Sequence, residues 1–110
     1  MKHEVNMLIT NIDYIPNKTI LEHYGIVNGS CVRSKHAGRD IMAGFKNFFG
    51  GELKGYTQLL EETRSQAIER MKQQAMQVGA NAVINVRFST SSVASGAAEI
   101  YVYGTAVRVD

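Results

Sequence analysis

Two segments that alternate apolar and polar residues place the strongest limit on how this chain can fold. In residues 82–89 and 99–109 every second residue faces one way, and small residues from Ser91 to Ala97 join the segments. A period of two is typical of a half-buried strand, and the short link predicts a β-hairpin. The apolar rows are Ala82, Ile84, Val86 and Phe88, then Ile100, Val102 and Ala106, with Gly104 on the same face. This pattern predicts Arg87 opposite Tyr103 and Phe88 opposite Val102.

Helical periodicity precedes the hairpin. From about Tyr56 to Val78 the apolar residues recur at helical spacing, and Gly79 then ends the helix. A shorter helix is predicted over residues 40–49, where Ile41, Phe45, Phe48 and Phe49 form one stripe. Residues 7–10 predict a short strand and residues 11–18 a loop. Residues 19–34 predict either one long strand with bulges or two strands split near Asn28 and Gly29.

This order of elements predicts an α+β fold, in which a mainly antiparallel sheet packs on two helices, one short and one long. At 110 residues the chain has the length of a single domain, spanning 1–110. The apolar rows of the hairpin should contact the helices. The opposite face of the sheet carries Tyr, Thr, Asn and Arg, so it should meet water, a neighbouring subunit or a ligand.

Charge and cysteine content exclude several classes of function. Twelve Lys and Arg face ten Asp and Glu, and no cluster of five basic residues occurs, so nucleic acid is not an expected partner. Cys31 is the only cysteine, which suits a reducing compartment. No apolar run approaches the roughly 20 residues of a membrane span, and the N-terminal residues lack the apolar core of a signal peptide. We therefore expect a cytoplasmic protein without a membrane span.

Few residues carry recognisable chemistry. Cys31 and His36, five positions apart, are the weak candidates for a metal site, because no CxxC, HxH or HxxxH pair occurs. The plainer interpretation is a buried cysteine and a surface histidine. The hydroxyl run Ser89–Ser92 lacks a nucleophile elbow, and the Gly50-Gly51 pair does not belong to a phosphate-binding loop. The residues themselves predict no cofactor and no catalytic group, and favour a protein that is not an enzyme.

A family resemblance covers nearly the whole chain. The residues that carry it are Gly79-Ala80-Asn81-Ala82-Val83, Arg87-Phe88 and Tyr103-Gly104-Thr105-Ala106-Val107, preceded by Gly50-Gly51-Glu52, Tyr56, Arg64, Ala67, Met71 and Ala75. This combination resembles the YbjQ family. The resemblance implies a dodecin-like subunit, a homopentamer and no established activity; only the family's label suggests heavy-metal binding. In local terms, Gly79 ends a helix, Asn81 orders a turn, and Gly104 should allow the sheet to approach the long helix.

Three functions remain open at this point. The leading hypothesis is a ring-forming homo-oligomer that binds a small ligand or partner between subunits. The others are a heavy-metal-binding ring and an enzyme whose site is shared between subunits. Phe48 and Phe49 should lie partly exposed on a monomer and so favour a subunit interface. The candidate ligand-binding residues are Arg64, Arg87, Glu99, Tyr101 and Tyr103.

Overall fold

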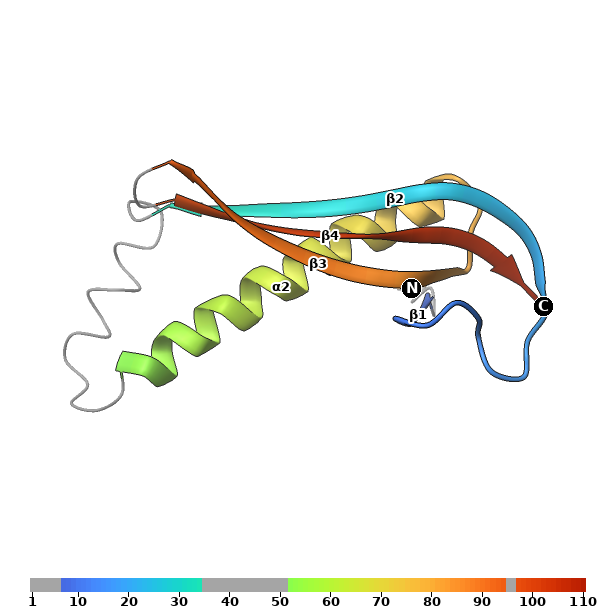
Figure 1. Cartoon of the computed structure of the whole chain (residues 1–110), viewed down its shortest axis with the longest axis horizontal. Coiled ribbons are helices and arrows are strands. Elements are labelled where there is room, and N and C mark those ends of the chain that lie inside the picture. The colour runs from blue at the N-terminus through green and yellow to red at the C-terminus, as the bar shows by residue number, and fades with distance from the viewer. Residues whose placement is uncertain (1–6, 35–51, 95–96) are drawn as a thin grey trace, which may run out of the picture.

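The computed structural model describes residues 7–34, 52–94 and 97–110, which form a four-stranded sheet with a long helix on one face (Figure 1). The strands are β1 (Leu8–Ile9), β2 (Ile20–Ser34), β3 (Ala82–Ala94) and β4 (Ala97–Val109), and the helix is α2 (Glu52–Gln77). The strand order is β1-β3-β4-β2. β4 pairs antiparallel with both β3 and β2, while the short β1 runs parallel to β3. The expected α+β class is confirmed.

Helix α2 packs on the sheet through small residues and one methionine. Ala67, Met71 and Ala75 recur every four residues along α2 and are fully buried. They meet Val27 of β2 and Val102 of β4 in the main core. The close approach depends on Gly29 of β2, because a Cβ at this position would collide with the backbone oxygen of Ala67. We call this side of the sheet the helix-covered face.

A second, smaller core lies on the other side of the sheet, at the end where β4 finishes. Here Ile15, from the loop between β1 and β2, covers apolar side chains of β3 and β4. The members of this core are Ile15, Ala82, Ile84, Val107 and Val109, with Ile20 at its border. The hairpin alternation had not predicted this second core, because it assigned a single apolar face to each strand.

A bulge in β3 explains the difference. Asn85 has a φ of 54°, and the pairing of β3 with β4 shifts between Ile84 and Arg87. The shift turns Ala82 and Ile84 away from α2, whereas Val83 and Val86 face it. The single apolar row predicted over residues 82–88 is therefore wrong before the bulge. Beyond the bulge the predicted register is confirmed, with Arg87 opposite Tyr103 and Phe88 opposite Val102.

Other expectations are met in part. Residues 20–34 form one strand with two register shifts, not a hairpin split at Asn28-Gly29. Gly79 follows α2 with a φ of 92°, as expected of a helix-ending glycine. Gly104 is crowded by Val83 and Val86 of β3, and not by the long helix as predicted. The predicted short helix over residues 40–49, with Phe48 and Phe49, lies outside the described residues, so α2 is the helix that can be compared with the prediction.

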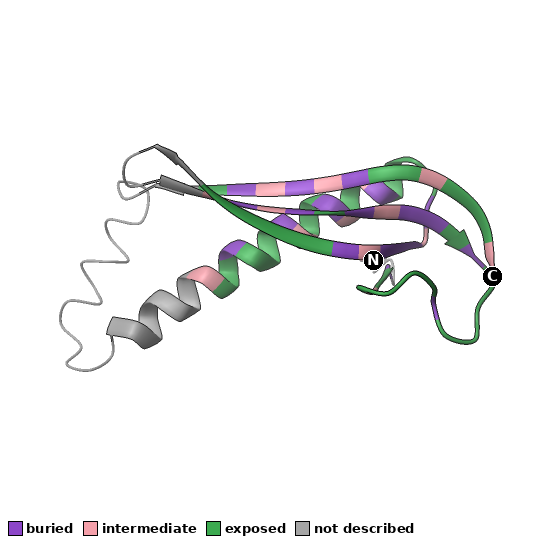
Figure 2. Ribbon diagram, viewed as in Figure 1, coloured by how far each residue is buried: buried purple, intermediate pink, exposed green. Residues whose placement is uncertain are grey.

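Buried and exposed residues alternate along β2, which shows directly that the sheet has one covered and one uncovered face (Figure 2). Val27 is 2% exposed, whereas its neighbour Ile26 is 77% exposed. No helix within the described ranges is long and apolar enough to cross a membrane.

Candidate functional site

The face of the sheet turned away from α2 is the principal candidate site, and we call it the open face. Its position follows from strand parity, because Val27 and Val102 point into the main core and their direct neighbours point the other way. It holds three aligned rows of side chains, which come from the three long strands. These are Arg87, Ser89 and Ser91 from β3, Glu99, Tyr101, Tyr103 and Thr105 from β4, and Ile26, Asn28, Ser30 and Val32 from β2.

Two tyrosines stand at the centre of the open face, on its middle strand. The ring centroids of Tyr101 and Tyr103 lie 5.5 Å apart, and the ring planes are tilted by 31°. Tyr103 lies between Arg87 and Asn28, its partners across β3 and β2. Tyr101 is flanked in the same way by two serines. The sheet register thus surrounds an aromatic pair with short polar side chains and one cation.

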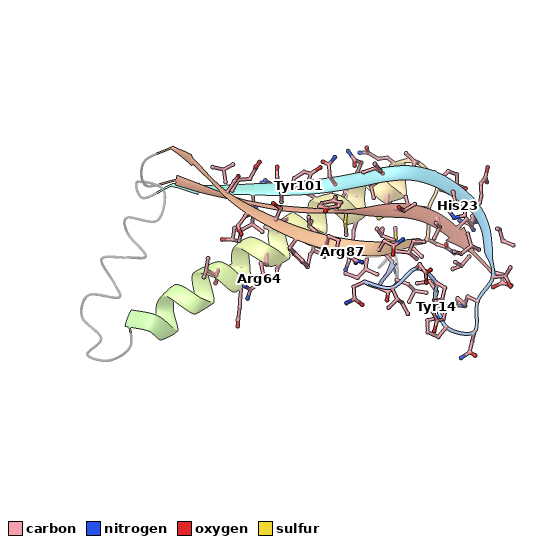
Figure 3. All side chains as sticks on the ribbon, viewed as in Figure 1. Tyr14, His23, Arg64, Arg87 and Tyr101 are labelled. Atoms are coloured by element: carbon pink, nitrogen blue, oxygen red, sulfur yellow. The ribbon has the colours of Figure 1, made fainter. Side chains whose placement is uncertain are left out.

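Arg87 lies at the β3 side of the open face, beside the loop that follows β1 (Figure 3). Its Nη1 donates hydrogen bonds to the backbone oxygens of Asn11, at 2.8 Å, and Val86, at 3.0 Å. These neutral acceptors orient the guanidinium without cancelling its charge. A groove of about 620 Å³ runs along the edge of β3 at this point, lined by Ile9, Thr10, Asn11, Val86, Arg87 and Phe88. Val86 and Phe88 belong to the row of β3 that faces α2, so the groove lies at the border between the two faces.

The other two charged candidates occupy different places. Glu99 belongs to the open face, on the same row of β4 as the two tyrosines, and it is half-buried. Arg64 is exposed on α2 and projects away from the strands (Figure 3). The structure therefore brings Arg87, Glu99, Tyr101 and Tyr103 onto one surface and separates Arg64 from them. Glu69, which also lies on α2, pairs with Lys72 at 3.6 Å.

The candidate metal ligands do not converge where the structure can be described. Cys31 is buried in the main core, and its Sγ donates to Oε1 of Gln66 at 3.2 Å. His36 falls outside the described residues. Within residues 7–34, 52–94 and 97–110, no three side chains of His, Cys, Asp or Glu come together. A transition-metal site needs such convergence of donors, so the described residues do not fit one.

The proposed structural motif has a clear local role in the case of Asn81. Its Nδ2 donates to the backbone oxygen of Val109, and its Oδ1 accepts from the backbone N–H of Val109, both at 2.8 Å. The side-chain amide thus makes the same pair of hydrogen bonds with β4 that the backbone of a neighbouring strand would make. Arg108 adds a bond from Nη1 to the backbone oxygen of Gly79. Asn81 and Gly79 therefore order the connection between α2 and β3.

Sequence reasoning missed the contribution of β2 to the open face. Ile26, Asn28, Ser30 and Val32 alternate with the buried Val27, Gly29 and Cys31. This period-two signal was present but was obscured by the glycines, which suggested interruptions. Sequence reasoning also missed two contacts between α2 and the outer edge of β2. Gln74 Oε1 accepts from the backbone N–H of Asn28 at 2.7 Å, and Arg70 Nη1 donates to the backbone oxygen of Ser30 at 2.6 Å.

Comparison with known proteins settles the family. The YbjQ_1 family, described as "Putative heavy-metal-binding", matches residues 7–110. The chain belongs to this family. Among its relatives, a UPF0145 protein of Hahella chejuensis is 72% identical over 104 residues, covering 94% of this chain and all of that protein. A UPF0145 protein of Thermotoga maritima is 51% identical over 104 residues, covering 94% of this chain and 98% of the relative. The resemblance noted in the sequence is thus confirmed.

A solved structure supports the fold of this family member. A Pediococcus pentosaceus protein of unknown function, from the DUF74 family, superposes with a TM-score of 0.64. The match covers 94% of this chain and 98% of that one, at 18% sequence identity. Likeness at this identity concerns the fold alone, so the function has to be argued from the surfaces described above.

Proposed function

We propose that this protein is a non-enzymatic homo-oligomeric ring, most simply a pentamer, that binds a small ligand on the surface between subunits. The observation that carries this proposal is that two unlike edges of the described sheet, that of β3 beyond β1 and that of β2, have no partner strand among the described residues. Unlike edges that pair with each other make a head-to-tail contact, and such contacts generate rings when the rotation closes. The family resemblance supplies the number five.

The free edge of β3 begins where β1 ends. Val86 directs its backbone N–H outward to the oxygen of Thr10, and its own oxygen accepts from Arg87. Because alternate residues of a strand direct their backbone groups to the same edge, Phe88 and Thr90 also point outward. No described strand lies beside them. An edge of this kind is a ready template for another strand.

The free edge of β2 is open at one end. Gln74 and Arg70 of α2 occupy the outward backbone groups at Asn28 and Ser30. Val32 is the next outward residue in this register, and its side chain is 52% exposed. The segment around Val32 is therefore the part of β2 that can accept the β3 edge of a neighbour. In such a ring the open faces of adjacent subunits become continuous.

Proline substitutions test the two edges separately. Thr90→Pro and Val32→Pro each remove an outward N–H without removing a hydrogen bond to β4, so the subunit should stay folded. Native mass spectrometry of the wild type should show a pentamer of the 12.2 kDa chain. Each proline variant alone should give monomer. Mixing the two variants should give a dimer, because one intact β2 edge still meets one intact β3 edge.

Alanine variants at the same two positions serve as matched controls for the proline variants. Thr90→Ala and Val32→Ala keep the N–H and should still assemble, while far-ultraviolet circular dichroism should confirm the fold of all four variants. A wild-type protein that is monomeric at micromolar concentration would contradict the proposed ring. So would proline variants that assemble as well as the alanine variants, because the contact would then lie elsewhere.

The family description also raises heavy-metal binding as a second function. The described donors do not fit such a site, since Cys31 is buried and bonded to Gln66. We therefore expect protein purified without an affinity tag to hold well below one equivalent of zinc, copper or nickel per subunit after dialysis. Elemental analysis checks this. Retention of one equivalent, lost in Cys31→Ser or His36→Ala, would establish the metal-binding function instead.

A further inference from the structure

We infer that the open face binds a purine nucleoside monophosphate, with the phosphate at Arg87, the base on Tyr101 and Tyr103, and the amino edge of the base at Glu99. This inference rests on the proposed function, because it names the ligand class of the open face that the ring makes continuous from one subunit to the next. It is carried by the order of these four side chains across one sheet face.

Arg87 supplies the anion-binding end. Its Nη1 is engaged by two backbone oxygens, which holds the guanidinium at the edge of the groove. The remaining N–H groups, on Nη2 and Nε, meet no acceptor among the described residues, and no carboxylate there forms an ion pair with Arg87. An oriented guanidinium with free donors suits a phosphate, which accepts two parallel hydrogen bonds. Thr10 lines the same groove, and its Oγ1 accepts from the backbone N–H of Ile12 at 3.4 Å.

The tyrosine pair supplies the surface for the base. Tyr103 lies directly opposite Arg87 in the register, so the aromatic surface begins beside the cation. Tyr101 continues it along the strand, with the ring centroids 5.5 Å apart. Aromatic side chains on an exposed sheet face are a general means of stacking nucleobases. The flanking Ser89 and Ser30 are short, and their hydroxyls can bond a ribose.

Glu99 closes the far end of the row. It lies four residues from Tyr103 on the same strand, a separation of about 13 Å at the usual rise of a strand. That separation is comparable to the span of a nucleoside monophosphate from the phosphate to the far edge of its base. A carboxylate accepts hydrogen bonds only, so it selects a base that presents N–H donors. Guanine presents two adjacent donors and adenine one amino group, and we therefore expect GMP to bind more tightly than AMP.

Titration calorimetry of the full chain with a panel of ligands tests this assignment. The panel is GMP, AMP, guanosine, ribose 5-phosphate and inorganic phosphate. GMP should bind best, and guanosine and ribose 5-phosphate should each bind at least tenfold more weakly, since each lacks one end of the ligand. Inorganic phosphate that binds as tightly as GMP would overturn the role of the tyrosines and Glu99.

Variants separate the three contacts. Arg87→Gln should weaken GMP binding at least tenfold and leave guanosine unaffected, while Arg108→Gln, an exposed arginine that bonds Gly79, serves as the control. Tyr103→Leu keeps apolar area and should weaken GMP and guanosine by the same factor. Glu99→Gln should remove the preference for GMP over AMP. Arg87→Gln that binds GMP like the wild type would refute the inference.

Native mass spectrometry of the same samples keeps the two proposals distinct. A ring that binds no nucleotide would overturn the ligand assignment and leave the assembly standing. A monomer that binds GMP with the predicted pattern would overturn the assembly and support the assignment. A single-stranded oligoribonucleotide that binds more tightly than GMP would also overturn it, because the face would then serve a polymer.

Discussion

The two faces of the sheet use the same strands in opposite ways. On the helix-covered face, Val27, Val83 and Val102 are almost completely buried, and the backbone of β2 meets α2 at Gly29. On the open face, Ile26 and Val32 leave more than half of their surface exposed. Each strand thus contributes one row to the main core, and its other row is more exposed outside the second core. Substitutions on the first face should therefore change the free energy of unfolding, and those on the second should change assembly and binding.

Gly29→Ala should have the largest effect. Its Cβ would collide with backbone atoms of α2 at Ala67 and Met71, so the helix itself has to move. We expect a loss of more than about 5 kcal/mol of unfolding free energy, which is the lower end of the stability of ordinary domains. Urea denaturation followed by circular dichroism measures it.

Gly25→Ala is the matched control. Gly25 has a φ of 94°, but a Cβ added there would meet no other atom within 4 Å. We expect a cost of only about 1–2 kcal/mol, from backbone strain alone. Equal effects at the two glycines would contradict the close contact of β2 with α2.

Met71→Ala sharpens the comparison by removing side-chain volume from the same face. Met71 is fully buried between α2 and the sheet, so the substitution leaves a cavity and should cost about 2–5 kcal/mol. Met76, on the same helix, is 44% exposed, and Met76→Ala should change stability by no more than about 0.5 kcal/mol. Thermal and urea unfolding of both variants would show the difference, and similar losses would refute it.

Tyr103→Ser tests how much a side chain of the open face contributes to the free energy of unfolding. Tyr103 is 38% exposed, so its contribution to the isolated subunit is limited to cross-strand contacts, worth about 1 kcal/mol or less. The measurement is best made together with Thr90→Pro, which keeps the subunit monomeric. A loss comparable to that of Met71→Ala would mean that the open face is part of the core.

The smallest expected effect concerns a titration at the edge of the main core. Partial burial raises the pKa of Tyr24 above 10.0, and the hydrogen bond of its hydroxyl to Glu22, at 3.1 Å, raises it further. A raised pKa in the folded state means that the contribution of Tyr24 to stability is present below pH 10 and is lost as pH rises through the folded value. Absorbance titration of tyrosinate in the wild type and in Tyr24→Phe should assign a raised pKa to Tyr24, and Glu22→Gln should lower that pKa.

Local patterns predicted the helix, the hairpin and the membership of the open face on β3 and β4. The long helix begins at Glu52, earlier than the predicted Tyr56, and the strands of the hairpin extend further into the small residues between them. The placement of Arg87, Tyr101, Tyr103 and Glu99 as neighbours followed from parity and register. This register is confirmed from Arg87 to Ser92 and is wrong by one residue before the bulge. Parity works here because a period of two depends only on local backbone geometry.

The remaining features depend on contacts between distant segments. The bulge at Asn85 is fixed by its N–H bond to Ile12, a residue of a loop more than 70 positions earlier. Ile15 forms a second core on a face that alternation alone assigned to water, a neighbouring subunit or a ligand. In the sequence, Gly29 suggests a break in a strand. Its role in the close contact between β2 and α2 is apparent only from the position of the helix. None of these can be derived from the local order of apolar and polar residues.

The position of β4 in the sheet also bears on how the chain reaches this structure during synthesis. β4 lies between β2 and β3, yet both partners precede it in the chain. Until β4 leaves the ribosome, β2 has no strand to pair with, and the apolar side of α2 lacks much of the surface that it will cover. Folding that depends on pairing between strands far apart in the sequence is slow, and it leaves apolar surface exposed to solvent for longer. We therefore expect nascent chains that stop before β4 to be substrates for chaperones, whereas chains that include it fold as a unit.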